Sequence, residues 1–339
     1  MLPTETGNCA GTIWHNYRED ELALLVKIRS HWRSFLRTLY SHFDHATESP
    51  MSKAPASWLA PFALLAVLSA TACAKAPSTD KDQTGIALFG ESSIPRTVGG
   101  HTYTSQAVEA TLGPHRFMFP ANFYYNQIGP FADGGVMLTV FWPGFEAAPP
   151  GDRPVRTTQD SRRQVLIELY YLDRVPITNY LARRSSNEAT TEAGSLERRN
   201  PVERLDLRVA QPDRWELTPY AIDRSLLAAY ARDSEQNLGV PYVHNPSMEP
   251  DWYVARSRDG QLSTFISCDP ADRIPDGLFA HGKMLERADG DRVAMCSHSL
   301  VDLDDSITIE MSYARVMLRD WKRLEATVRN LLRRYRVKP

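Results

Sequence analysis

The segment CSHSLVDLDD, residues 296–305, comes closer to a reactive constellation than any other part of the sequence. His298 and Ser299 have the residue types of a base and a nucleophile, and one of the three following aspartates could orient the histidine. Strand alternation argues against this chemistry, because His298 would share a face with Cys296 and the aspartates would form a turn. The aspartates could also bind Ca²⁺, but they lack the spacing of an EF-hand loop. We therefore predict neither a catalytic site nor a metal site.

The rest of the sequence lacks the usual motifs of enzyme sites. It contains no G-x-S-x-G nucleophile turn and no phosphate-binding G-x-x-x-x-G-K-[ST] or G-x-G-x-x-G loop. It also contains no H-E-x-x-H and no paired C-x-x-C motif that would indicate zinc. The sequence thus favours a binding protein without a cofactor, and an envelope hydrolase with an unrecognised site is the enzyme alternative.

Positive and negative charges are balanced along the chain. The 39 lysines and arginines and the 41 aspartates and glutamates give a net charge of −2. Proteins that bind nucleic acid contact its phosphates through lysine and arginine, and they usually carry an excess of positive charge. We therefore expect no nucleic-acid partner.

Residues 51–80, MSKAPASWLAPFALLAVLSATACAKAPSTD, have the layout of an export signal. Lys53 supplies positive charge, residues 58–70 are almost purely apolar, and small residues follow. A membrane-spanning helix needs about 20 apolar residues, which is more than this stretch offers. We predict a cleaved signal peptide over residues 51–72, and an uncleaved membrane anchor is the alternative.

The end of this segment, LSATAC, resembles the lipobox of bacterial lipoproteins. That resemblance implies a diacylglyceryl group on the sulfur of Cys73, cleavage before it, and attachment to the membrane through the lipid. Ala74 stands where lipoproteins retained in the inner membrane carry Asp, so the resemblance points to the outer membrane, with the protein facing the periplasm. The alternative is an ordinary secreted protein in which Cys73 occurs by chance.

An export signal acts at the start of a chain, so its position predicts the domain organisation. We expect translation to begin at Met51 and residues 1–50 to be an upstream extension of the gene; a cytoplasmic tail on an uncleaved anchor is the alternative. Residues 73–100 are small and polar and are predicted to be a flexible tether. Residues 101–339 form the globular domain, which a polar stretch near residues 183–200 divides into two halves.

Two cysteines remain in the globular domain, Cys268 and Cys296. An isolated pair in an oxidising compartment is most simply a disulfide, so we predict that these two are bonded to each other. The alternative is a pair of buried free thiols.

The hydrophobic pattern predicts an α+β fold made mainly of antiparallel sheet. Strands are expected over residues 115–120, 135–142, 164–172, 203–210, 251–256, 262–268, 293–300 and 306–313. Residues 177–184 are expected to be helical. Residues 315–335 place apolar side chains three and four apart, which predicts a long amphipathic helix packed on one face of the sheet, with its basic face in solvent.

Aromatic residues are concentrated in FPANFYYNQIGPFADGG, residues 119–135. The aromatic rings of such a loop can pack in the core. Alternatively, they can contact a partner, because aromatic residues dominate binding hot spots. The candidate partner-binding residues are Phe123, Tyr124, Tyr125 and Phe131.

Three blocks of the sequence together resemble a group of Gram-negative lipoproteins. They are FMFPANFYYNQIGP with GGVMLTVFWPGFE, then a Cys…Cys-Ser-His pair, and then SYARVMLRDWKRLEATVRNLL. Some members of that group resemble periplasmic immunity proteins encoded beside antibacterial effectors of contact-dependent secretion systems. The resemblance implies a lipid-anchored protein that binds and neutralises a toxin. A scaffold lipoprotein that assembles the envelope is a further alternative.

Overall fold

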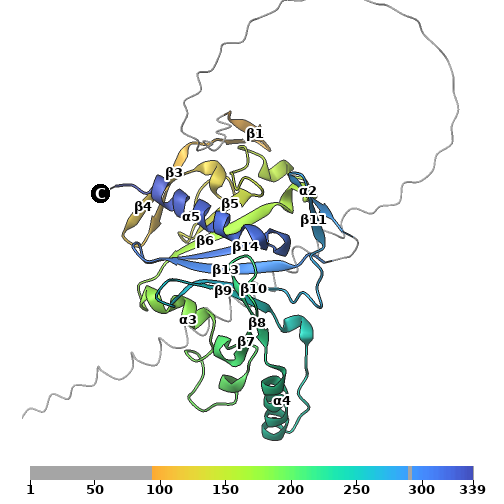
Figure 1. The fold of residues 1–339 in the computed structure, drawn as a ribbon. Coiled ribbons are helices and arrows are strands. Elements are labelled where there is room, and N and C mark those ends of the chain that lie inside the picture. Colours follow the sequence, from red (N-terminus) through yellow and green to blue (C-terminus); the bar gives the residue numbers. More distant parts are fainter. Residues whose placement is uncertain (1–93, 289–291, 339) are drawn as a thin grey trace, which may run out of the picture. The chain divides into compact units, whose positions relative to one another are not determined.

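Eight antiparallel strands form one sheet that organises the structure (Figure 1). The computed structural model describes residues 94–288 and 292–338, all within the unit Gly85–Pro339. The predictions for residues 1–50, the signal peptide, Cys73 and most of the tether lie outside the described residues. The strand order is β5-β6-β14-β13-β10-β9-β8-β7, so strands from both sides of residues 183–200 pair within one sheet.

The strands of this sheet have the following bounds: β5 (Val136–Phe141), β6 (Gln164–Tyr171), β7 (Arg208–Ala210), β8 (Thr218–Ile222), β9 (Asp251–Arg256), β10 (Leu262–Cys268), β13 (Met295–Asp302) and β14 (Ile307–Ala314). Three separate hairpins pair β1 (Arg96–Val98) with β2 (His101–Tyr103), β3 (Ala107–Leu112) with β4 (His115–Pro120), and β11 (Leu278–His281) with β12 (Met284–Arg287).

Four α-helices lie in the described residues: α2 (Thr158–Ser161), α3 (Tyr180–Arg184), α4 (Arg224–Leu238) and α5 (Trp321–Tyr335). Short 3₁₀ turns complete the description: η1 (Ala121–Phe123), η2 (Arg153–Val155), η3 (Ile177–Asn179), η4 (Glu197–Arg199), η5 (Leu205–Leu207), η6 (Pro246–Met248) and η7 (Arg315–Asp320). The predicted helix over residues 315–335 is therefore a 3₁₀ turn that continues into α5. The predicted α+β class, with antiparallel sheet and a C-terminal helix, is confirmed.

Period-two alternation in β14 explains why the sheet has two different faces. Ile307, Ile309, Met311 and Tyr313 are all fully buried on one face, while Glu310 lies on the other. The first face joins α5 and the β3–β4 hairpin in the larger hydrophobic core. The second face packs α3 against β9 and β10 in a smaller core. Each face of the central strands is thus covered by a helix (Figure 1).

Helix α5 covers the larger core with one side only. Its buried side chains recur three, four and seven residues apart: Trp321, Leu324, Val328, Leu331 and Leu332. The exposed side carries basic residues such as Arg333 and Arg334. Both arginines lie in the last turn, where positive charge offsets the negative end of the helix dipole.

The prediction of a half-buried strand over residues 203–210 was wrong. Residues 205–207 form the 3₁₀ turn η5, and only the last three residues are a strand. The side chains also do not alternate as in a strand with an apolar inner face, because Arg208 is buried and Val209 is exposed. The guanidinium of Arg208 donates to the carbonyls of Pro201, Val202 and Pro250 and lies 3.7 Å over the ring of Trp252. Burial lowers the pKa of Arg208 to about 9, although the charges of Asp251 and Glu249 oppose this.

Replacing Leu324 with Ala should strongly destabilise the domain. Leu324 is 1% exposed in the centre of the core, and truncating a buried leucine costs about 2–5 kcal/mol of unfolding free energy. Arg333→Ala, on the exposed side of the same helix, should change stability by less than about 0.5 kcal/mol. Urea unfolding followed by circular dichroism measures both; equal effects of the two substitutions would contradict this packing of α5.

Candidate functional site

His298 lies completely buried between the sheet and α5. Its Nδ1 lies 3.1 Å from the hydroxyl of Tyr313, and its Nε2 lies 3.0 Å from Oε1 of Glu325. Thr264 donates its hydroxyl to the same Glu325 oxygen at 2.6 Å. Both ring nitrogens therefore have partners inside the core, and the group links β10, β13 and β14 to α5.

Ser299 points to the opposite face of the sheet, as strand alternation requires. Its hydroxyl donates to Oε1 of Glu310 at 2.9 Å, and Arg184 from α3 donates to Ser299 at 3.4 Å. Tyr180, also from α3, donates to Glu310. Since the sheet separates the side chains of His298 and Ser299, they cannot act as a base and its nucleophile.

The three aspartates at the end of β13 and just after it form a turn. The backbone N–H groups of Asp304 and Asp305 both donate to Oδ1 of Asp302, at 3.2 Å and 3.3 Å. Asp305 also pairs with Arg336 at 2.6 Å. Within residues 94–288 and 292–338, no group of three or more His, Cys, Asp and Glu side chains could hold a metal ion.

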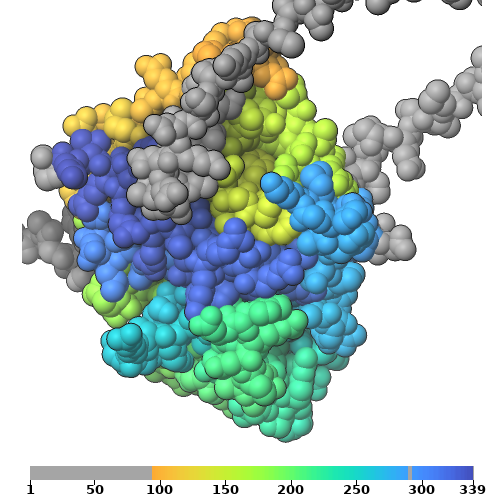
Figure 2. Space-filling model, turned by 45° about the horizontal axis from the view of Figure 1, so that its top comes forward, coloured from red at the N-terminus to blue at the C-terminus, as the bar shows by residue number. Residues whose placement is uncertain are grey.

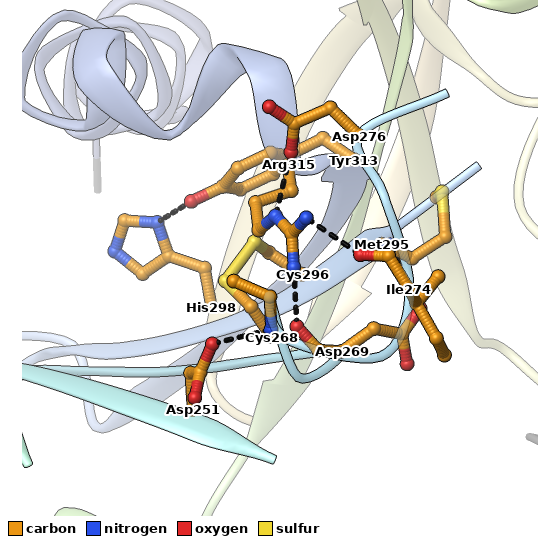
Figure 3. Close-up of a disulfide and its surroundings, with 11 residues drawn as sticks. Asp251, Cys268, Asp269, Ile274, Asp276, Met295, Cys296, His298, Tyr313 and Arg315 are labelled. Carbon is orange, nitrogen blue, oxygen red and sulfur yellow. Dashed lines mark hydrogen bonds and ion pairs between the residues drawn. A yellow bond between two sulfur atoms is a disulfide. The ribbon is translucent and has the colours of Figure 1, made fainter. Parts of the chain in front are cut away.

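Cys268 and Cys296 are joined by a disulfide, as predicted (Figure 3). They are direct partners in the β10–β13 register, and both are buried. Arg315 lies beside them and donates to Oδ1 of Asp276 at 2.6 Å and to the carbonyls of Asp269 and Ile274 (Figure 3). The disulfide and this arginine together hold the base of the segment that carries the β11–β12 hairpin.

The structure divides the four aromatic residues predicted to contact a partner. Phe123 and Tyr124 are 4% and 1% exposed, so these two rings belong to the core. The hydroxyl of Tyr124 donates to the carbonyl of Val108, and replacing this residue would therefore disturb the fold. Phe131 is 42% exposed, and the half-buried Tyr125 lies 4.3 Å under the guanidinium of Arg153. Of the predicted set, Phe131 and Tyr125 can still reach a partner.

The loop that carries Phe131 is held in place by buried polar contacts. Gln127 is buried, donates to the carbonyl of Pro149 and accepts from the backbone N–H of Arg153. Asn126 accepts from the backbone N–H groups of Ile128 and Gly129. These bonds fix the backbone before any partner arrives, which lowers the entropic cost of binding.

Two other exposed apolar surfaces have no clear signal in the sequence pattern. One surrounds the end of α4, where Leu238, Val240, Val243 and Met248 are all more than half exposed. The other is Trp215, which is 41% exposed in the turn between β7 and β8. Trp215 is an isolated aromatic in a polar stretch, so neither periodicity nor clustering could have indicated it. No helix in the described part of the chain is long and apolar enough to span a membrane.

Comparison with known proteins gives one informative match. No protein-family model matches the chain, and no curated protein matches it. Among solved structures, the chain is similar to Smlt3025, an immunity protein of the Stenotrophomonas maltophilia type IV secretion system. The two are 44% identical with a TM-score of 0.69, and the match covers 72% of this chain and 98% of the other. This chain belongs to the family of that immunity protein. The resemblance to immunity proteins expected from the sequence is thereby supported.

Replacing both cysteines with alanine should lower the stability of the protein without changing its fold. The disulfide closes a loop between residues 28 apart, and the chain-entropy model gives a stabilisation of about 3–4 kcal/mol for such a loop. The free energy of unfolding should fall by about that amount in Cys268→Ala/Cys296→Ala, measured with guanidinium chloride. Adding a reductant should lower the stability of the wild type similarly and leave the variant unchanged. Equal stability of reduced and oxidised wild type would contradict the prediction.

The stability of the domain should depend on the ionisation of Glu325. Burial opposes ionisation of this carboxyl, but the bonds from His298 and Thr264 and the charge of Arg329 outweigh it and hold its pKa below 4.5. A carboxyl with a lowered pKa in the folded state stabilises it above the unfolded pKa and loses that contribution as the pH falls through the folded value.

The variant Glu325→Gln should therefore lose less unfolding free energy than the wild type as the pH falls below the ordinary pKa of a glutamate carboxyl. Glu192→Gln, at an exposed carboxyl, is the matched control and should follow the wild type. Parallel pH profiles for the wild type and Glu325→Gln would show that this carboxyl does not contribute.

Proposed function

We propose that this protein is an immunity protein that binds an effector of a bacterial secretion system and thereby neutralises it. The observation that carries the proposal is the 44% identity to an immunity protein over 98% of that protein's length. Identity at this level over nearly the whole of that protein means that the two share a fold. The effector would be a protein, and the interaction would be stoichiometric.

The distribution of polar groups supports binding as the mode of action. His298 and Ser299 lie on opposite faces of the sheet, and both are 0% exposed. Each is hydrogen-bonded to a glutamate, His298 to Glu325 and Ser299 to Glu310. The side chains offered to solvent include rings and large apolar groups, such as Phe131 and Trp215. Aromatic residues of this kind supply most of the energy of protein–protein interfaces.

We further propose that the protein acts from the cell envelope, facing the periplasm, with a lipid on Cys73 that attaches it to the outer membrane. The export-like segment and lipobox before Cys73 support this location. The Cys268–Cys296 disulfide supports it independently, because disulfides persist in oxidising compartments. Residues 73–100 would give the domain the reach to meet an effector that enters the periplasm.

Cells that produce the protein should survive an effector that kills cells without it. The test uses candidate effectors cloned from the genes on either side of this protein's gene, each directed to the periplasm of a bacterial host, with the protein supplied from a second promoter. Survival should rise with the ratio of protein to effector, because each molecule of protein neutralises one effector. No protection at any ratio would contradict the proposal.

The lipid anchor is tested in the same cells by Cys73→Ser. This variant should leave the membrane fraction, and the domain should still bind effector once purified. Unchanged partitioning into detergent would contradict lipidation of Cys73.

A further inference from the structure

The turn between β7 and β8 has an unusual backbone for its sequence. Arg214 and Leu217 exchange backbone hydrogen bonds across it, and only Trp215 and Glu216 lie between them. Both of these residues have positive φ, 57° and 62°. Two-residue turns of this kind ordinarily carry Asn-Gly, because positive φ strains residues with larger side chains. Such strain is concentrated at functional positions, so the presence of tryptophan here calls for a functional reason.

The strained turn is held against the start of α5. Trp321 donates its indole N–H to the carbonyl of Trp215 at 2.9 Å, and Lys322 pairs with Glu216. Figure 2 shows the green segment that contains β7 and β8 lying against the dark-blue C-terminal segment. The indole of Trp215 remains 41% exposed, with the guanidinium of Arg214 stacked 4.0 Å from its ring. Tryptophan and arginine are the two residue types most enriched in binding hot spots.

The surface beside this turn is basic. Residues 319–323, at the start of α5, contain three basic residues and one acidic residue, and Arg214 lies in the turn itself. Two of these basic groups are offset within the protein, because Asp320 pairs with Arg323 and Glu216 pairs with Lys322. Among the described residues, Arg214 and Arg319 have no carboxylate partner. A partner that covers this surface must supply negative charge.

We propose that Arg214, Trp215, Arg319 and Lys322 form the surface that docks the effector, which we call the Trp215 face. Its occupant is an acidic surface of the effector with an apolar pocket that receives the indole. This proposal rests on the proposed immunity function and names the surface that performs it. The fixed turn presents the ring in one orientation, so little conformational freedom is lost on binding.

An anionic membrane would also attract a basic surface with a tryptophan, but the turn argues against it. Glu216 stands beside Trp215 with its side chain 75% exposed, and Asp213 is exposed on the other side. An anionic membrane surface would repel Asp213, and it would compete with Glu216 for Lys322. A protein partner can place a donor opposite each of them and acids opposite the arginines.

The decisive variant is Trp215→Asn, because asparagine tolerates positive φ and removes the ring. It should melt at the same temperature as the wild type or higher, and yet bind the purified effector identified in the survival test at least about 30-fold more weakly. Phe279→Ala is the matched control, since Phe279 is a comparably exposed ring in the β11–β12 hairpin. It should bind within about threefold of the wild type.

Arg319→Glu adds an independent test of charge. It should slow association and flatten the salt dependence of the association rate, while the dissociation rate changes little. Calorimetry and surface plasmon resonance measure these quantities.

Each outcome decides a different point. If the wild type does not bind the effector, the proposed function fails and this inference with it. If the wild type binds and Trp215→Asn binds equally well, the Trp215 face is wrong while the immunity function stands. If the delipidated domain sediments with vesicles of phosphatidylglycerol and phosphatidylethanolamine, and Trp215→Asn abolishes this, the surface binds membranes and the inference is overturned.

Discussion

The packing of α5 on the apolar face of β13 and β14 is the interaction on which the rest of this structure depends. These two strands lie in the middle of the eight-stranded sheet, and their apolar side chains would be exposed without a cover. At the centre of the contact, Glu325 of α5 bonds both His298 and Thr264. A buried polar group is costly unless it is bonded, so this group permits only one register of the helix on the sheet.

That register determines where the surface features lie. Because α5 begins at Trp321, the first two residues of the helix hold the turn at Trp215 and Glu216. The six residues of η7 place Arg315 beside the disulfide, where it fixes the segment between Cys268 and Cys296. The core therefore provides a rigid platform, and its exposed loops are positioned by bonds that exist before any partner binds.

Sequence patterns predicted the helices and strands that bury one face and expose the other. Strand β14 alternates cleanly and α5 repeats with helical period, and both were predicted to within a few residues. Helix α4 was not predicted, because only Leu227 and Ser234 are buried and the helix therefore has no apolar stripe. Its caps were the available signal: Asp223 precedes the helix, and Gly239 follows it with a left-handed backbone. The burial of Arg208 could not be predicted, because its guanidinium bonds carbonyl oxygens that only the folded chain brings together. Trp215 could not be predicted, since its position depends on a backbone conformation that tryptophan rarely adopts.

The central claim is that this rigid platform neutralises an effector by stoichiometric binding. It is tested most directly by titrating the purified effector's activity with the purified domain, residues 94–339, at concentrations far above the dissociation constant. The account predicts a linear fall in activity that reaches zero when the two proteins are present in equal amounts. Complete inactivation by a small fraction of an equivalent would indicate a catalytic mechanism, and full activity in the presence of excess domain would show that the domain does not neutralise this effector; either result would contradict the account.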